Sequence, residues 1–251
     1  MAALIATNLG YILLAFLPPV FWLLFYLRED KHPEPKTLLL LSFVGGMVAA
    51  LLALFAECVW AFFLTGSCGG LGITNANPFL IFLGISLIEE YVKYLPVKFL
   101  IHKKADFDEP VDAMVYMMTA ALGFAALENA LFGFQFFYKF AGDSFTMLPF
   151  SQENVLAGLN IAANRFVGAN LLHALSSGIV GFFLARAWFS PYRRHFLALG
   201  ILLASLLHTG FNYLILVRES LSQATLYIIL LLSTMAVMVF IDFERLKKRN
   251  K

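Results

Sequence analysis

Charged residues are scarce in this chain of 251 residues, because Asp, Glu, Lys and Arg make up only 14% of it. Soluble proteins have about 25%. Hydrophobic residues make up 61%, and the mean hydropathy is +0.80. This composition excludes a soluble globular protein and indicates one that crosses a membrane several times. We expect residues 1–251 to form a single transmembrane domain, with the lipid bilayer around it and no nucleic-acid partner.

Cysteine is almost absent. Cys58 and Cys68 are the only two, which excludes a disulfide framework and a CxxC metal site. They could pair with each other if the membrane face near them is oxidising. The N-terminus also lacks the basic segment that opens a signal peptide. We therefore interpret its apolar run, which passes through Pro18 and Pro19, as a span that is retained.

Seven apolar runs are each long enough to cross about 30 Å of hydrocarbon as a helix. They cover residues 8–27, 37–64, 78–101, 111–138, 164–189, 195–217 and 222–243. The predicted fold class is therefore all-α, a polytopic membrane bundle of about seven transmembrane helices with a polar intramembrane site. The longest connection, residues 139–163, is predicted to be a loop that could cover this site.

Basic residues favour one side of this bundle. Thirteen Lys or Arg lie in the segments 28–36, 102–110, 186–195 and 244–251. The segments predicted on the other side, 1–7, 65–77, 139–163 and 218–221, hold only Lys139 and Arg218. Lys and Arg are in excess on the cytoplasmic side of membrane proteins. The sequence therefore predicts an N-terminus outside and a C-terminus in the cytoplasm.

The third run contains three ionisable residues, Glu89, Glu90 and Lys93. An ionisable group in the hydrocarbon core costs roughly 2.5 to 3.5 kcal/mol even on lenient insertion scales, so it usually has a function. Lys93 follows the two glutamates by four and three residues, on the same helical face, and can hold one carboxylate ionised. The other carboxyl can carry a proton, since two negative charges are unfavourable in a low-dielectric cavity.

Further polar residues interrupt three other runs, namely Glu128, Asn129, His173, His208 and Asn212. Counted from the predicted outer ends, Glu89, Glu128, His173 and His208 lie at one depth, roughly 13 to 17 Å. Carboxylates and imidazoles at one level suit a metal ion or the activation of water.

These polar residues are also compatible with simpler roles. The charged groups of the third run could form only a structural ion-pair network, and each histidine alone could be a hydrogen-bonded helix contact. A proton-coupled transporter or ion pathway would also use intramembrane Glu and His. The two halves of the chain show no sustained similarity, which disfavours a transporter built from inverted repeats.

Longer motifs surround the polar residues. Residues 26–35 end in Pro-Glu-Pro, residues 89–93 read Glu-Glu-x-x-Lys, residues 108–129 run from Asp-Glu-Pro-Val-Asp to Glu-Asn, and His173 and His208-x-x-x-Asn212 follow. In this order they resemble the PrsW-type intramembrane protease family, in the wider group that includes the CAAX prenyl endopeptidases. The CAAX enzymes have Arg one position after Lys93, so prenyl-peptide processing is not implied.

The resemblance implies an intramembrane endopeptidase of the bacterial cytoplasmic membrane that cleaves a membrane-anchored protein substrate. Members of this family cleave an anti-sigma factor on its extracytoplasmic side. A member that only binds membrane partners is disfavoured by the intact set of ionisable residues. The catalytic residues would be Glu89, Glu90, Glu128, His173 and His208.

Two mechanisms are compatible with this set. Glu89 or Glu90 would take a proton from water as the general base. Glu128, His173 and His208 would either bind Zn²⁺ or hydrogen-bond the water and the oxyanion directly. Asn129, Asn212 and Lys93 are candidates for contacts with the substrate or the oxyanion.

Overall fold

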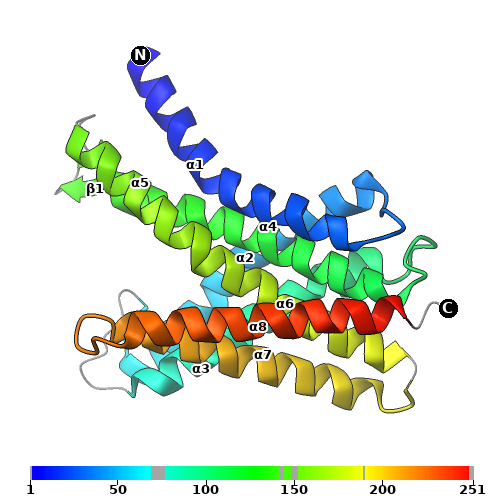
Figure 1. The fold of residues 1–251 in the computed structure, drawn as a ribbon. Coiled ribbons are helices and arrows are strands. Elements are labelled where there is room, and N and C mark those ends of the chain that lie inside the picture. Colours follow the sequence, from blue (N-terminus) through cyan, green and yellow to red (C-terminus); the bar gives the residue numbers. More distant parts are fainter. Residues whose placement is uncertain (1, 69–76, 142–143, 148–151, 189, 249–251) are drawn as a thin grey trace.

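The chain forms a helical bundle in a computed structural model that describes residues 2–68, 77–141, 144–147, 152–188 and 190–248. Side chains are described for residues 13–68, 77–133, 156, 157, 159, 160, 163–187 and 190–248. Within these ranges the helices are α1 (Ala2–Tyr26), α2 (Lys36–Thr65), α3 (Pro78–Pro96), α4 (Pro110–Phe137), α5 (Gln152–Val167), α6 (Ala169–Trp188), α7 (Arg193–Leu216) and α8 (Ala224–Lys247). Figure 1 shows most of them running side by side, with the two termini at opposite ends.

The prediction of an all-α membrane bundle is confirmed. Among the described residues, five helices are long and apolar enough to span a membrane: Lys36–Thr65, Pro110–Gly133, Ala163–Ala187, Arg193–Leu216 and Ala224–Lys247. The two other predicted spans correspond to α1 and α3. Helix α3 has only 19 residues and carries three charged side chains. The run 78–101 ends in a π-helical turn, η2 (Val97–Ile101), after Pro96.

Helix α4 is the centre of the bundle. In its apolar 18-residue window 94% of the residues are buried, against 33% in α2 and 22% in α8. Glycines allow α2 to approach α4 closely, because a Cβ on Gly46 would collide with the carbonyl of Ala120, and one on Gly123 with the carbonyl of Phe43. Small residues let backbones approach in this way in membrane helices. The most buried helix therefore carries Glu128.

Local sequence signals fix the ends of the helices that lead to the site. Helix α3 begins at Pro78 because the Asn77 side chain accepts a hydrogen bond from the Phe79 N–H at 2.9 Å, and Pro at the first position needs no such partner. Helix α2 ends at Gly66, which has a φ of 74°. Glycine adopts this left-handed conformation without steric penalty.

The prediction of a loop over residues 139–163 is wrong. Residues Tyr138–Ala141 (β1) and Ser144–Met147 (β2) form an antiparallel pair, and α5 covers Gln152–Val167. Part of the predicted loop, residues 142–143 and 148–151, lies outside the described residues. The polar composition of Gln152–Asn164 suggested a loop, but this segment forms a helix that lies against α1, α4 and α6. The predicted run 164–189 accordingly divides into the end of α5 and all of α6.

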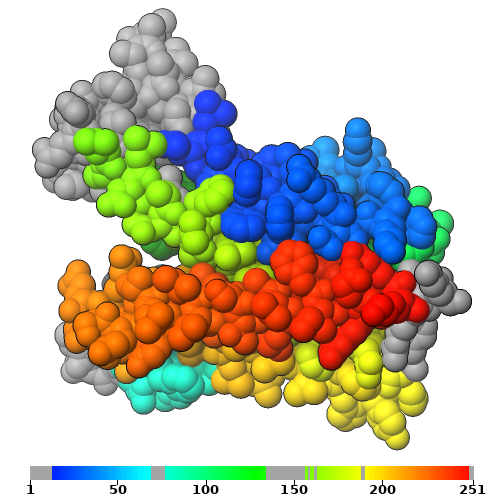
Figure 2. Space-filling model, viewed as in Figure 1, coloured from blue at the N-terminus to red at the C-terminus, as the bar shows by residue number. Residues whose placement is uncertain are grey.

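The two ends of the bundle differ in their contacts. At one end Lys247 forms an ion pair with Glu29 at 2.8 Å, and His32 lies 2.7 Å from Glu109. Three of the four basic segments, 28–36, 102–110 and 244–251, therefore meet at this end. At the other end Cys58 and Cys68 form a disulfide. Figure 2 shows a notch between α5 and the first half of α8, whereas the second half of α8 lies against α1.

Candidate active site

Helix α3 places Glu89, Glu90 and Lys93 on one buried face. The spacing of three and four residues brings Lys93 Nζ to 2.9 Å from Glu90 Oε1 and 3.1 Å from Glu89 Oε2. Lys93 and Glu90 have 0% exposed surface and Glu89 has 6%. The Lys93 ammonium also lies 4.6 Å from the centre of the Phe124 ring on α4. The charged groups thus form one compact, dry cluster.

Glu90 is saturated with partners. Besides Lys93, its carboxylate lies 2.9 Å from His208 Nδ1 and accepts hydrogen bonds from Ser176 Oγ at 2.9 Å and Ser177 Oγ at 3.2 Å. Because a carboxylate only accepts, His208 Nδ1 carries the proton. His208 Nε2 is then the nitrogen with a free lone pair, and it faces Glu89. Glu90 therefore fixes the tautomer and orientation of His208.

His173 is held in the same manner by Glu128. Its Nε2 lies 2.7 Å from Glu128 Oε2, so Nε2 carries the proton. Its Nδ1 faces the centre of the cluster and accepts a hydrogen bond from Lys93 Nζ at 2.8 Å. Each histidine thus has a carboxylate behind it and a lone pair in front, which is the arrangement that orients histidine ligands of metals in proteins.

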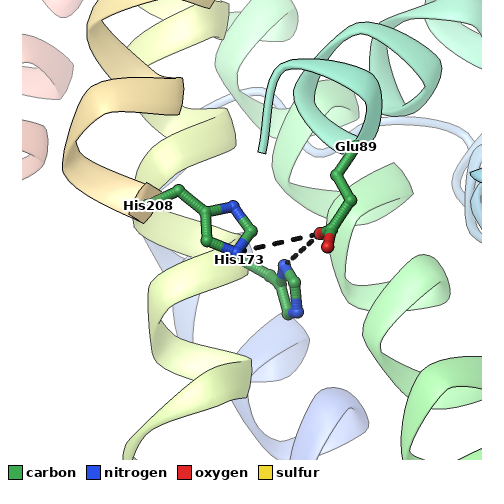
Figure 3. A group of neighbouring side chains, drawn as sticks. All are labelled: Glu89, His173 and His208. Atoms are coloured by element: carbon green, nitrogen blue, oxygen red, sulfur yellow. Dashed lines mark ion pairs between the residues drawn. The ribbon is translucent and has the colours of Figure 1, made fainter. Parts of the chain in front are cut away.

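Three side chains from three helices can hold a metal ion. The ligand atoms of Glu89, His173 and His208 all lie within 4.8 Å of one another. Figure 3 shows both imidazoles turned toward the Glu89 carboxylate, with separations of 3.7 Å from His173 Nδ1 and 3.8 Å from His208 Nε2. One carboxylate and two imidazoles are a usual zinc set. The Lys93 ammonium donates hydrogen bonds to two of these atoms, Glu89 Oε2 and His173 Nδ1, so a metal ion would have to displace it from them.

This grouping differs from the predicted metal set of Glu128, His173 and His208. Glu128 contacts the far nitrogen of His173 and is 26% exposed, whereas Glu89 lies in front of both rings. Glu128 also pairs with Arg165 of α5, at 2.9 Å between its Oε2 and Nη2. The sequence did not single out Arg165, although a basic residue at the start of an apolar run is the kind of signal that could have found it.

The two asparagines have different surroundings. Asn129 donates to the Ala15 carbonyl and to Asn170 Oδ1, both at 3.0 Å, and accepts from Arg165 Nε. Its amide therefore joins α1, α4, α5 and α6. Asn212 is half-buried on α7, one turn from His208 on the same face.

A further residue that the sequence did not single out is Glu57 of α2, which is acidic. It is half-buried and interacts electrostatically with Glu89, Glu128 and Lys93. The signal that could have found it is a lone carboxylate inside an apolar run.

Taken together, a membrane helix bundle with a buried histidine and carboxylate site is compatible with an intramembrane hydrolase of the metal-dependent class. A sequence model of the family described as "PrsW family intramembrane metalloprotease" matches residues 34–241. The chain belongs to this family, as the resemblance of its motifs predicted. It is an intramembrane protease, and the family gives no support to the transporter alternative.

Curated relatives agree with this family. The protein named "Protease PrsW" of Geobacillus kaustophilus is 30% identical over 78% of this chain and 74% of its own length. Those of the same name in Oceanobacillus iheyensis and Bacillus subtilis are 28% and 29% identical, over 96% and 90% of this chain and 96% and 88% of their own lengths. No solved structure matches the chain.

Proposed function

We propose that this protease hydrolyses a peptide bond in a membrane-anchored protein substrate at the cluster of Glu89, His173 and His208. The observation that carries the proposal is the convergence of these three side chains within 4.8 Å, each histidine being oriented by a carboxylate behind it. The substrate class is proposed as a single-span protein such as an anti-sigma factor, cut near its extracytoplasmic side.

We assign the metal as Zn²⁺, held by Glu89 Oε2, His173 Nδ1 and His208 Nε2. A bound zinc ion supplies positive charge that polarises a carbonyl and acidifies a water molecule. Glu90 and Glu128 keep the two histidines in the tautomers that leave these nitrogens unprotonated. The donor atoms are the ones zinc prefers, and their surroundings are nearly free of solvent.

We propose the roles of Lys93, Asn212 and Asn129 from where they lie relative to the cluster. The Lys93 ammonium is fully buried at the cluster and provides fixed positive charge where the oxyanion develops. We assign the Asn212 amide as a hydrogen-bond donor to that oxyanion, because Asn212 lies one turn from His208 on the same face of α7. Asn129 is a positioning residue, because its amide is already engaged by α1, α5 and α6.

The proposed orientation has the N-terminus outside and the C-terminus in the cytoplasm of a bacterium. The Cys58–Cys68 disulfide supports it, since disulfides persist in oxidising compartments and this one lies at the predicted outer end. The basic segments at the opposite end support it independently.

The test uses purified, never-chelated protein in proteoliposomes with a single-span reporter, whose fluorescent domain outside the membrane is released on cleavage. We expect about one zinc per chain and release of the domain. His173→Ala should lose both. Ser42→Ala, which removes a buried hydroxyl on α2 that bonds the Tyr116 carbonyl, should keep both. A His173→Ala variant that inserts normally and releases the domain at the wild-type rate would refute the proposal.

A further inference from the structure

The register of α2 places Glu57 beside the site. Ala49, Ala50 and Ala53 of α2 pack in one buried cluster with Val92 of α3 and Phe124 of α4. Residues four apart lie on the same face of a helix, one turn along it. Glu57 follows Ala53 by four residues and therefore continues the face of α2 that meets α3 and α4.

One turn further along α3 and α4, at the level of Glu57, lie two carboxylates of the site. Helix α3 runs in the direction opposite to α2, so the turn level with Glu57 is the one before Val92, which carries Glu89. On α4 the turn after Phe124 carries Glu128. Glu57, Glu89 and Glu128 thus come from three helices at one level. Glu57 interacts electrostatically with both Glu89 and Glu128, which agrees with this register.

Within the described part of the chain, Glu57 differs from the other site carboxylates in having no hydrogen-bond or ion-pair partner. Glu90 has four contacts and is fully buried, Glu128 is bound by His173 and Arg165, and Glu89 lies between the two histidines. Among the described residues no hydrogen bond or ion pair engages Glu57, which is half-buried. An intramembrane carboxylate without a structural partner is expected to serve a function.

We propose that Glu57 is the general base of the reaction, an inference that rests on the proposed peptide hydrolysis. The Glu57 carboxylate takes one proton from water as the water oxygen forms a bond to the scissile carbonyl carbon, whose π electrons move to its oxygen. When the carbonyl re-forms, the C–N bond breaks and Glu57 returns the proton to the leaving nitrogen. One water is consumed, and one carboxyl and one amine group are produced.

The sequence left open whether Glu89 or Glu90 is the general base, and the contacts of both residues disfavour that role. Glu90 is fully buried, and its oxygens are already engaged by Lys93, His208, Ser176 and Ser177. Glu89 belongs to the group that would hold the metal. Glu57 lies on a third helix, level with the cluster, and among the described residues it makes no hydrogen bond or ion pair with it.

The experiment compares Glu57→Gln, Glu57→Asp and Glu57→Ala with the wild type in the reporter assay, together with zinc content. Glu219→Gln is the matched control, because it removes an exposed carboxylate outside the site. We expect Glu57→Gln to keep its zinc and to cleave at least about 100-fold more slowly, the usual range for a lost general base. Glu57→Asp should retain part of the rate, and added formate should raise the rate of Glu57→Ala.

Each contrary outcome has its own meaning. Wild-type cleavage by Glu57→Gln would overturn the role of Glu57 and leave the protease function intact. Loss of zinc from Glu57→Gln would make Glu57 a ligand and would equally overturn it. A Glu57→Ala variant that formate does not rescue would assign Glu57 a structural role. A wild type that releases no reporter would refute the proposed function itself.

Discussion

The chemistry of this site depends on side chains that each contact more than one partner. Glu90 is an example, because it orients His208 while it also binds Lys93 and two serines. Replacing it by Gln keeps the shape but lets the amide donate where only an acceptor fits. We expect Glu90→Gln to weaken zinc binding about 10- to 100-fold in a competition with a chelator. Ser205→Ala, a buried hydroxyl on α7 outside the cluster, should leave zinc affinity unchanged.

Glu34 predicts a pH dependence of stability at the other end of the bundle. Burial raises its pKa from 4.5 to about 8, a hydrogen bond from Tyr116 opposes this rise, and the neighbouring Asp112 adds to it. The folded state therefore holds a proton that the unfolded state releases above pH 4.5. The resulting stability is complete below about pH 4.5 and is lost as pH rises toward about 8. Thermal unfolding in detergent should show this decline, Glu34→Gln should flatten it, and Glu219→Gln should leave it unchanged.

Among the helices, the contact between α2 and α4 decides whether the site can form, because Glu57 lies on α2 and Glu128 on α4. Gly46 and Gly123 face the backbone of the opposite helix, so an added methyl group has no space. We expect Gly46→Ala and Gly123→Ala each to lower stability by about 1–3 kcal/mol and to slow reporter cleavage. Gly133→Ala is the control, since a Cβ there meets nothing within 4 Å and alanine favours the helix. Equal unfolding temperatures for all three variants would contradict the close contact.

The whole molecule has two distinct ends, and the disulfide gives a test of which one is outside. In intact cells, a membrane-impermeant maleimide should label Cys58 and Cys68 only after treatment with an impermeant reductant. The Cys58→Ser/Cys68→Ser variant should show no labelling and serves as the control. Labelling that requires permeabilised cells would place this end in the cytoplasm and reverse the proposed orientation.

The amino-acid sequence by itself determined the class of fold and the list of chemical groups. Apolar runs of sufficient length can only be helices in a bilayer, since every backbone polar group must be satisfied within the segment. Charged groups inside such runs are so unfavourable that Glu89, Glu90, Lys93 and Glu128 stood out without any structure. Their order along the chain was enough to indicate the protease family.

Only the tertiary structure decided which groups face one another. Periodicity gives the face of one helix but not its rotation against the next, so the sequence could not assign Glu128 behind His173 and Glu89 in front of it. The same limitation concealed Arg165 and Glu57, which become part of the site through α5 and α2. Helix α5 was missed because its polar residues resemble a loop, whereas a helix in a protein depends largely on its contacts with neighbours, here α1 and α6.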